Sequence, residues 1–365
     1  MNDNLIPAPA KYHQLKGNTS LVYDAICKVL SERQEQVDWA QFGQAEWQLL
    51  ASMAEAEGVG PLLYWKLKAV GSGQCVVESP DTPASGWRNE HNGGVLALMP
   101  AAVWKFLQTS YYKTAARNAV LLGELDRILA AFEAAKIPVI VLKGAALAQT
   151  VYPDPGLRPM GDLDLLIPES CVYKTFKLLK KQYAFLEAKG DHLIFFKQEA
   201  GILLEIHWGL SGSYQHEPFI PTSMVNVDKQ AGQNVLSTPW QIVHLSTHLT
   251  RHSTKNNLIL KWVMDLYILL GLLTQDDQEA LVKITRNYHR QQSFSEMWVI
   301  LQLHFPDLTA LLGTQFLSDH KKDGQLEKAR YQIVKEAFQA LPLILWPPVA
   351  FLYLQKQIFK LRTTG

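Results

Sequence analysis

The chain has 365 residues, 48% of them apolar, and its 35 basic and 34 acidic residues leave a formal net charge of +1. This length allows two or three domains with a sizeable core, and the near-neutral charge provides no electrostatic footprint for nucleic acid. The three cysteines form no CxxC pair, which disfavours a zinc ribbon, and the N-terminus lacks a signal-peptide pattern, so we expect a cytoplasmic protein.

The N-terminal part of the chain has helical patterns on both sides of a long loop. Apolar residues recur at helical spacing in residues 38–55 and 61–70. Residues 71–94 are rich in Gly, Ser and Pro, and this composition predicts a loop. Helical spacing then continues through residues 100–136, as two helices or one bent helix. We therefore expect a helical N-terminal region over residues 1–117.

The next stretch combines a buried strand with a possible anion site. The β-branched run 138–142 predicts a strand that ends at Lys143-Gly144, before a short helical pattern. Backbone N–H groups at such a strand-to-helix junction favour an anion. Lys143 adds a positive charge, and the guanidinium of Arg158 in the following loop is suited to phosphate oxygens.

Two acids follow directly after Gly161, where a second apolar run begins, DLDLLIP. Alternate residues of a strand share a face, so Asp162 and Asp164 should project together. Two such carboxylates repel each other, and a hard divalent cation, Mg²⁺ or Mn²⁺, would neutralise them. Gly161 would let the backbone approach a ligand closely. The alternative is a solvated strand end that carries two exposed acids.

A β-hairpin is predicted next, because two apolar runs flank the turn at residues 198–201. On its second strand, Glu205 and His207 share one face. Glu205 lies among apolar residues and needs a partner. If this strand lies beside that of Asp162, three carboxylates converge; otherwise Glu205 is an edge-strand acid facing water. His207 would orient Glu205, contact a substrate, or make a structural hydrogen bond.

Residues 209–235 have loop-like composition and suggest a connection between domains. Three histidines, His244, His248 and His252, then recur every four residues and share one face of a predicted helix. No HExxH glutamate or nearby cysteine accompanies them, so we favour a helix face that lines a nucleotide cleft over a zinc site.

The helical pattern continues to the C-terminus and defines an expected C-terminal region, residues 231–365. Within it, Asp265 lies in an apolar helix and needs a partner, for which Lys261 has the right spacing. Residues 340–354 are strongly apolar but are broken by two prolines. A buried or surface-associated helix pair is favoured there over a transmembrane span.

The segment LKGAALAQTVYPDPGLRPMGDLDLLIPES, residues 142–170, resembles the signature of an uncharacterised bacterial nucleotidyltransferase group in the DNA polymerase beta-like superfamily. The resemblance implies transfer of a nucleoside monophosphate from an NTP, with two metal ions and a third carboxylate on a later strand. It also places a histidine-bearing helix and a W-x-x-D helix beside the active site, as His248 and Asp265 would be here. The chain departs from the usual Gly-Gly or Gly-Ser pair, because Gly144-Ala145 follows Lys143.

Residues and resemblance together predict an α+β fold, with a small mixed-sheet core over residues 118–230 between the two helical regions. Catalysis and metal binding are assigned to Asp162, Asp164 and Glu205. The expected nucleotide-binding residues are Lys143, Gly144, Arg158, Gly161, His207 and His248. The expected reaction consumes an NTP, releases pyrophosphate and modifies a hydroxyl of a small molecule, sugar or protein. The alternative is an inactive nucleotide- or partner-binding module, and a nucleic-acid acceptor is disfavoured.

Overall fold

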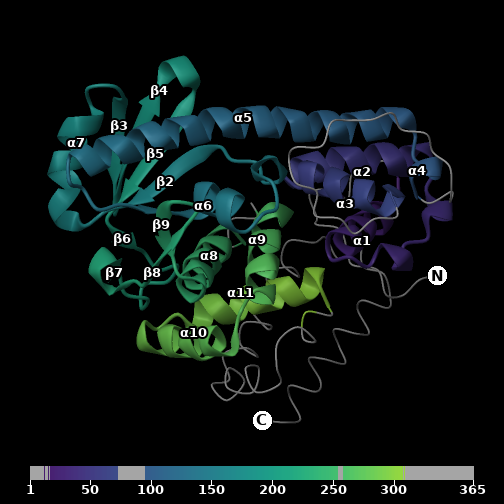
Figure 1. Cartoon of the computed structure of the whole chain (residues 1–365). Coiled ribbons are helices and arrows are strands. Elements are labelled where there is room, and N and C mark those ends of the chain that lie inside the picture. The colour runs from purple at the N-terminus through teal and green to yellow at the C-terminus, as the bar shows by residue number, and fades with distance from the viewer. Residues whose placement is uncertain are drawn as a thin grey trace, which may run out of the picture.

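The computed structural model describes residues 17–72, 95–253 and 258–306, together with Tyr12, Leu15 and Leu308. One long helix connects two parts of this structure (Figure 1). It runs from a group of N-terminal helices, across one face of a β-sheet, and the C-terminal helices lie against the rest of the sheet. The apolar segment 340–354 and most of the predicted loop at 71–94 fall outside the described residues.

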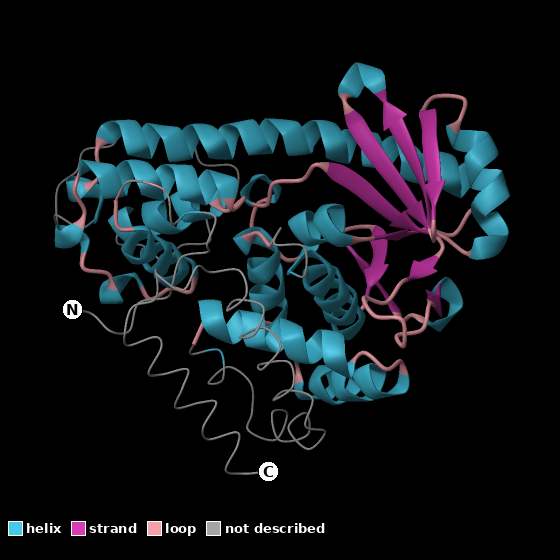
Figure 2. Ribbon diagram, turned by 180° about the vertical axis from the view of Figure 1, so that it is seen from behind, coloured by secondary structure: helices cyan, strands magenta, loops and turns pink. Residues whose placement is uncertain are grey.

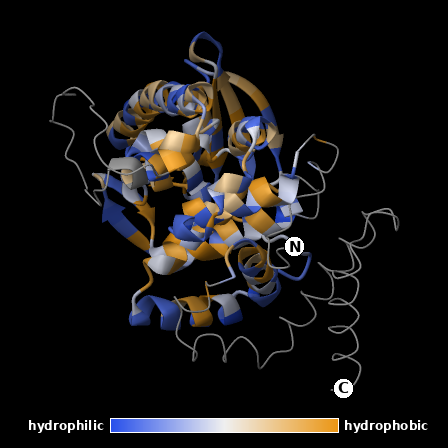
Figure 3. Ribbon diagram, turned by 90° about the vertical axis from the view of Figure 1, so that its right-hand side faces the viewer, coloured by the Kyte–Doolittle hydropathy of each residue, from blue (hydrophilic) through white to orange (hydrophobic). Residues whose placement is uncertain are grey.

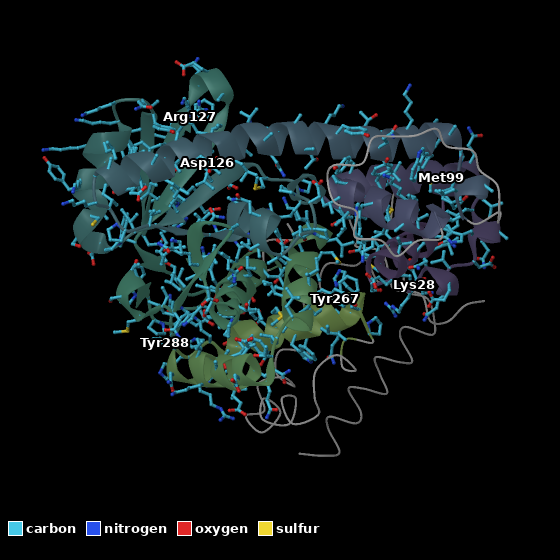
Figure 4. All side chains as sticks on the ribbon, in the orientation of Figure 1. Lys28, Met99, Asp126, Arg127, Tyr267 and Tyr288 are labelled. Atoms are coloured by element: carbon cyan, nitrogen blue, oxygen red, sulfur yellow. The ribbon has the colours of Figure 1, made fainter. Side chains whose placement is uncertain are left out.

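The N-terminal part is helical, as its apolar spacing predicts. Its helices are α1 (Thr19–Leu30), α2 (Gln44–Ala56), α3 (Gly60–Ser72), α4 (Val95–Leu98) and the long α5 (Ala101–Ala134). α5 is one continuous helix of 34 residues, not two. Its first half packs Val103 and Leu107 into the core of the helical part, while Leu121 and Phe132 pack into the core of the sheet. Arg127, on the outer side of α5 (Figure 4), is largely exposed and pairs with Glu124 at 2.7 Å.

The main sheet has seven strands in the order β3-β4-β5-β2-β1-β9-β8 (Figure 2). The strands are β1 (Ile140–Val141), β2 (Asp162–Leu166), β3 (Ala184–Lys189), β4 (His192–Lys197), β5 (Ile202–His207), β8 (Val227–Gln230) and β9 (Gln233–Leu236). β2 pairs in parallel with β5, and β1 with β9, whereas the remaining pairs are antiparallel. This mixed sheet among helices confirms the α+β prediction.

The alternation of side chains on β2 and β5 decides where the acids point. Leu163 and Leu165 on β2 belong to the core between the sheet and α5, as do Leu204 and Ile206 on β5. Alternate strand residues face opposite sides, so Asp162, Asp164 and Glu205 project from the other face. Short elements link β1 to β2: α6 (Lys143–Thr150) and the 3-10 turn η4 (Pro155–Leu157).

The segment between β5 and the C-terminal helices is more ordered than its composition predicts. The prediction of a loop over residues 209–235 is wrong, because these residues contain the small β6–β7 sheet (Gly209–Leu210 and Ile220–Pro221) and the β8–β9 hairpin. The expected region boundary after residue 230 falls inside that hairpin, and the one after residue 117 falls inside α5. The division into three regions therefore stays a prediction.

Four helices follow the sheet: α8 (Thr238–Ser253), α9 (Leu260–Gly271), α10 (Gln275–Asn287) and α11 (Gln291–His304). Apolar and polar stripes alternate on the helices (Figure 3). α8 and α9 bury Leu249, Val263 and Leu266 in one core with α1 to α3. Among the described residues, none of the helices is both long enough and apolar enough to cross a membrane.

Candidate active site

The register of two neighbouring strands sets Asp164 beside Glu205. In the parallel pairing of β2 with β5, Asp164 lies opposite Glu205, and Leu166 lies opposite His207. The predicted adjacency of the Glu205 strand and the Asp162 strand is therefore confirmed. Because directly paired residues on one face have neighbouring side chains, both carboxylates and the imidazole are placed at the same end of the sheet.

Asp164 is the centre of this group and is only 2% exposed. Its Oδ1 accepts a hydrogen bond from Nζ of Lys143 at 2.6 Å, and Nε2 of His207 lies 3.1 Å from the same oxygen. The same Nε2 is 3.4 Å from Oε2 of Glu205. His207 therefore bridges two carboxylates, and Lys143 supplies the nearest fixed positive charge.

The charges of this group shift the pKa values of its members in opposite directions. The negative charge of Asp164, followed by burial, raises the pKa of Asp162 to about 6. Burial would raise the pKa of Asp164 as well, but Lys143 and His207 outweigh it and hold that pKa far below its ordinary value. Burial lowers the pKa of Lys143, yet the charge of Asp164 more than compensates, so the pKa of Lys143 is raised. Divergent carboxyl pKa values are typical of catalytic sites.

Lys143 reaches Asp164 from a constrained backbone position. It begins α6 directly after β1, with a φ of +45°, a left-handed conformation that is uncommon for a residue with a side chain. The N–H of the preceding Leu142 donates to the backbone carbonyl of Asp164 at 3.0 Å, which ties the junction to β2. Positive φ at non-glycine residues tends to occur at functional sites.

Gly144 follows because its position has no room for a side chain. A Cβ atom there would lie 2.6 Å from Nη1 of Arg158 and 3.3 Å from Cγ of Met160. Gly161 differs, since a Cβ atom would meet nothing within 4 Å and the residue is exposed. The protein therefore leaves open space beside the backbone at the start of β2, next to Asp162.

Arg158 is placed differently from the sequence expectation. It is 5% exposed, and its Nε and Nη2 donate to the two oxygens of Asp265, at 3.0 and 2.6 Å. Tyr152 donates its hydroxyl to the same carboxylate at 2.8 Å. The guanidinium fork predicted to hold phosphate is thus occupied. The expected Lys261–Asp265 pairing is wrong, because Asp265 pairs with Arg158 while Nζ of Lys261 donates to the carbonyl of Pro159 at 3.1 Å.

The histidines of α8 share one side of the helix, as predicted. His244 lines a small cavity that Lys143 also lines. Burial and the charge of Lys143 lower the pKa of His244 to about 3, which keeps this imidazole neutral. The ring of His248 packs against those of His252 and Trp262, with centroids 4.5 and 5.0 Å away. His248 is therefore held by aromatic neighbours, and its predicted contact with a nucleotide stays a prediction.

Comparison with known proteins assigns the chain to a family. The model of a family described as uncharacterised nucleotidyltransferase matches residues 43–306. The chain belongs to this nucleotidyltransferase family. The resemblance of residues 142–170 to that group is thereby confirmed, and the match extends far into both helical regions. The search of curated proteins found no match.

Solved structures similar to this nucleotidyltransferase family member are distant. A solution structure of the antibiotic-resistance factor ANT(2'')-Ia is 12% identical, with a TM-score of 0.36, and covers 47% of this chain and 94% of its own. A crystal structure of ANT(2'')-Ia with adenylyl-2''-tobramycin is 14% identical, with a TM-score of 0.35, covering 47% and 98%. A nucleotidyltransferase-like protein from Paracoccidioides brasiliensis is 17% identical, with a TM-score of 0.27, covering 46% and 88%.

The side chains of this family member fit a divalent cation. Asp164, Glu205 and His207 each offer a ligand atom, and these atoms all lie within 4.8 Å of one another. Asp162 lies two residues before Asp164 on the same face of β2 and adjoins the group. Carboxylate oxygens are the donors that Mg²⁺ and Mn²⁺ take in proteins.

Sequence reasoning missed a second group beside the first. Asp191 directly precedes β4 and His192 begins it, and with His207 they place one ligand atom each within 4.8 Å of the other two. The signal in the sequence was an Asp-His pair at the start of the strand that precedes the predicted turn, opposite a histidine at the far end of the hairpin. Only the strand register shows that these ends meet.

Proposed function

We propose that this family member is a metal-dependent nucleotidyltransferase that moves a nucleoside monophosphate from an NTP to a hydroxyl of a small molecule, sugar or protein, with release of pyrophosphate. The observation that carries the proposal is the set Asp162, Asp164 and Glu205 on one face of the neighbouring parallel strands β2 and β5, with Asp164 directly opposite Glu205. These acids lie beside the lysine that opens α6. A nucleotidyl transfer site needs both features, a carboxylate set and a cationic neighbour.

Asp162, Asp164 and Glu205 would hold the cations. A bound pair of divalent ions stabilises both the attacking and the leaving oxygens of an in-line displacement. The buried Asp164 carries a fixed negative charge, because Lys143 and His207 hold its pKa low. Glu205 is less buried, with a side chain 20% exposed. It is therefore the better placed of the two to accept a proton from an acceptor hydroxyl.

The start of α6 would receive the phosphates. The helix begins where β1 ends, and N–H groups at a helix N-terminus attract anions. The ammonium of Lys143 is at the same place, so it would neutralise phosphate oxygens near Asp164. Gly144 lets Arg158 and Met160 pack directly against the first turn of α6.

Arg158 would act indirectly. Its two nitrogens hold Asp265 on α9, while its Nη1 lies over Gly144. We assign it the positioning of the turn before β2, because the same pair joins that turn to the C-terminal helices. The sequence had predicted a direct phosphate contact, and that contact would require the buried ion pair to open.

Thermal unfolding with each of ATP, GTP, CTP and UTP, with and without Mg²⁺ or Mn²⁺, tests the proposal. A ligand that binds only the folded protein raises the melting temperature by mass action. We expect a shift that needs both nucleotide and metal in the wild type and is lost in Asp162→Asn and Asp164→Asn. The matched control is Asp228→Asn, an exposed acid on the β8 edge strand, which should keep the shift.

The proposal fails if no nucleotide shifts the wild-type melting temperature, or if Asp162→Asn retains the full shift. The former result would favour the alternative of a partner-binding module. If the shift is present, transfer of an α-labelled nucleotide to a panel of hydroxyl compounds and proteins would identify the acceptor. The nucleotide with the largest shift would be the donor to label.

A further inference from the structure

His207 lies at the boundary between two groups of side chains. On one side are Asp164 and Glu205, and on the other are Asp191 and His192. The antiparallel register of β4 with β5, two strands that lie side by side in Figure 1, pairs His192 directly with His207. Their ring centroids are 4.9 Å apart, with a tilt of 32° between the planes. Cross-strand pairs of this kind keep their side chains close in every fluctuation that preserves the strand pairing.

The second group has the donor atoms of a cation site. One ligand atom each from Asp191, His192 and His207 lies within 4.8 Å of the other two. All three side chains are partly buried, with exposed fractions of 22%, 18% and 10%. The group is therefore mostly buried but still reaches solvent.

Neighbouring groups hold these donors in place. Ser211, just after β6, donates its hydroxyl to Oδ2 of Asp191. Nδ1 of His192 lies 3.1 Å from Oδ1 of the same carboxylate, so the Nε2 of His192 remains as a lone-pair donor. The backbone N–H of Trp208 donates to the carbonyl of Asp191 at 3.3 Å. Supporting hydrogen bonds of this kind orient metal ligands and fix their tautomers.

We propose that Asp191, His192 and His207 bind a borderline first-row divalent cation of the Zn²⁺, Co²⁺ or Mn²⁺ type, at a site separate from the carboxylates assigned to nucleotidyl transfer. Two imidazoles and one carboxylate form a donor set that suits these ions. Mg²⁺ prefers oxygen ligands in near-ideal octahedral geometry, and a set with two nitrogens selects against it.

The shared histidine couples this site to the carboxylates. A cation at the second site takes His207 as a ligand, and His207 also contacts Asp164 and Glu205. The ion would fix the ring orientation and tie β4 to β5 at the open end of their hairpin, two residues beyond Glu205. This inference does not rest on nucleotidyl transfer, because an ion can bind there whatever the reaction is.

Titration of the metal-free full chain with Co²⁺ tests the site, since its visible absorption reports nitrogen ligands and coordination number. We expect the absorption of a site with nitrogen ligands to saturate at one ion per chain, whatever ions the carboxylates take up, and Zn²⁺ to remove that absorption. His192→Gln and Asp191→Asn should each weaken binding about tenfold or more. The matched control His216→Gln removes an exposed histidine outside the group and should leave binding unchanged.

Asp162→Asn separates this proposal from that of nucleotidyl transfer. It should abolish the Mg²⁺-dependent nucleotide shift and leave Co²⁺ affinity within about threefold, which is under 1 kcal/mol. The opposite result, with Co²⁺ binding lost in Asp162→Asn and kept in His192→Gln, would overturn the second site. So would a wild type that binds no Co²⁺.

NMR spectra of the Co²⁺-bound wild type test the site without any variant, so they do not depend on whether the variants fold. Bound Co²⁺ shifts the proton resonances of its histidine ligands far outside the normal NMR range. Two shifted imidazole N–H signals are expected, one from His192 and one from His207. The absence of shifted histidine signals would contradict the proposal even if the variants were unfolded.

Discussion

Two ion-pair groups that both involve residues between 143 and 164 differ in how their charges are balanced. The first, here called the closed pair, is Arg158 with Asp265, joined by Tyr152. Both oxygens of Asp265 accept from the guanidinium, one also accepts from the Tyr152 hydroxyl, and Asp265 is fully buried. One positive charge meets one negative charge in a bidentate geometry, so nothing is left for a ligand to satisfy.

The second, here called the carboxylate cluster, comprises Asp162, Asp164 and Glu205 with Lys143 and His207. Three acids face one lysine and one histidine, and the two cationic groups converge on a single oxygen of Asp164. The remaining repulsion appears in Asp162, whose pKa rises to about 6. The contrast teaches that a satisfied buried pair acts as scaffold, whereas excess like charge held at a strand end indicates a place for a cation or chemistry.

Breaking the closed pair should have the largest effect on stability. Asp265→Ala leaves the Arg158 guanidinium buried without its counter-charge and the Tyr152 hydroxyl without its acceptor. Loss of one partner of a buried ion pair costs about 3–5 kcal/mol. We expect urea denaturation to show a free energy of unfolding lower by that amount. Asp126→Ala, at an exposed position on α5 (Figure 4), is the control and should change little.

A loss below about 1 kcal/mol in Asp265→Ala would contradict the closed pair, because it would place the pair in the class of exposed ion pairs. Arg158 would then be available to bind phosphate directly, as the sequence predicted. A change in the urea dependence without a change in the midpoint would instead indicate a different unfolded state.

The pKa of Lys261 depends on whether Asp265 pairs with Arg158 alone. Burial, followed by the charge of Arg158, lowers the pKa of Lys261 from 10.5 to about 8. Between these two values the unfolded chain binds more protons than the folded one, so the free energy of unfolding rises with pH in this window. The wild type should therefore gain about 2–3 kcal/mol relative to Lys261→Met between pH 8 and pH 10.5.

Pairs of urea melts across this pH range would measure that gain, and Lys283→Met at an exposed position of α10 provides the control difference. A difference between wild type and Lys261→Met that does not change with pH would mean that an acid pairs with Lys261. Asp265 would then pair with both Arg158 and Lys261. The closed pair would have an excess of charge, as the carboxylate cluster does.

The sequence was informative where local periodicity decides structure. Period-two alternation correctly put Asp162, Asp164 and Glu205 on one side of their strands, because neighbouring leucines and isoleucines had to enter the core. The strand adjacency of Glu205 was a conditional prediction, and the register confirmed it. Helical spacing likewise identified the run through α5, although not its continuity.

Local sequence patterns could not predict which residues pair when they lie far apart in the chain. Asp265 lies 107 residues from Arg158, so a partner four residues away seemed closer, and only the tertiary fold brings the arginine to it. The Asp191–His192 group depends on a hairpin register that joins residues at opposite ends of two strands. The β8–β9 hairpin was missed because β8 is an exposed, mostly polar edge strand, and its composition resembles that of a loop.

The smallest expected effect has the opposite sign. Asp162→Asn removes one negative charge that Asp164 and burial disfavour, while the amide keeps the size of the side chain. Since one pKa unit corresponds to about 1.4 kcal/mol and the pKa of Asp162 rises from 3.8 to about 6, removing this repulsion should stabilise the folded protein by no more than about 3 kcal/mol at pH 7 without ligand. Thermal unfolding would show a higher melting temperature for the variant. The same variant should lose the stabilisation by Mg²⁺ and nucleotide. The charge that destabilises the folded protein is the charge that binds the cation, so removing it increases stability and abolishes binding. A melting temperature that falls would mean that Asp162 already has a favourable partner in the folded state, and the carboxylate cluster would then resemble the closed pair.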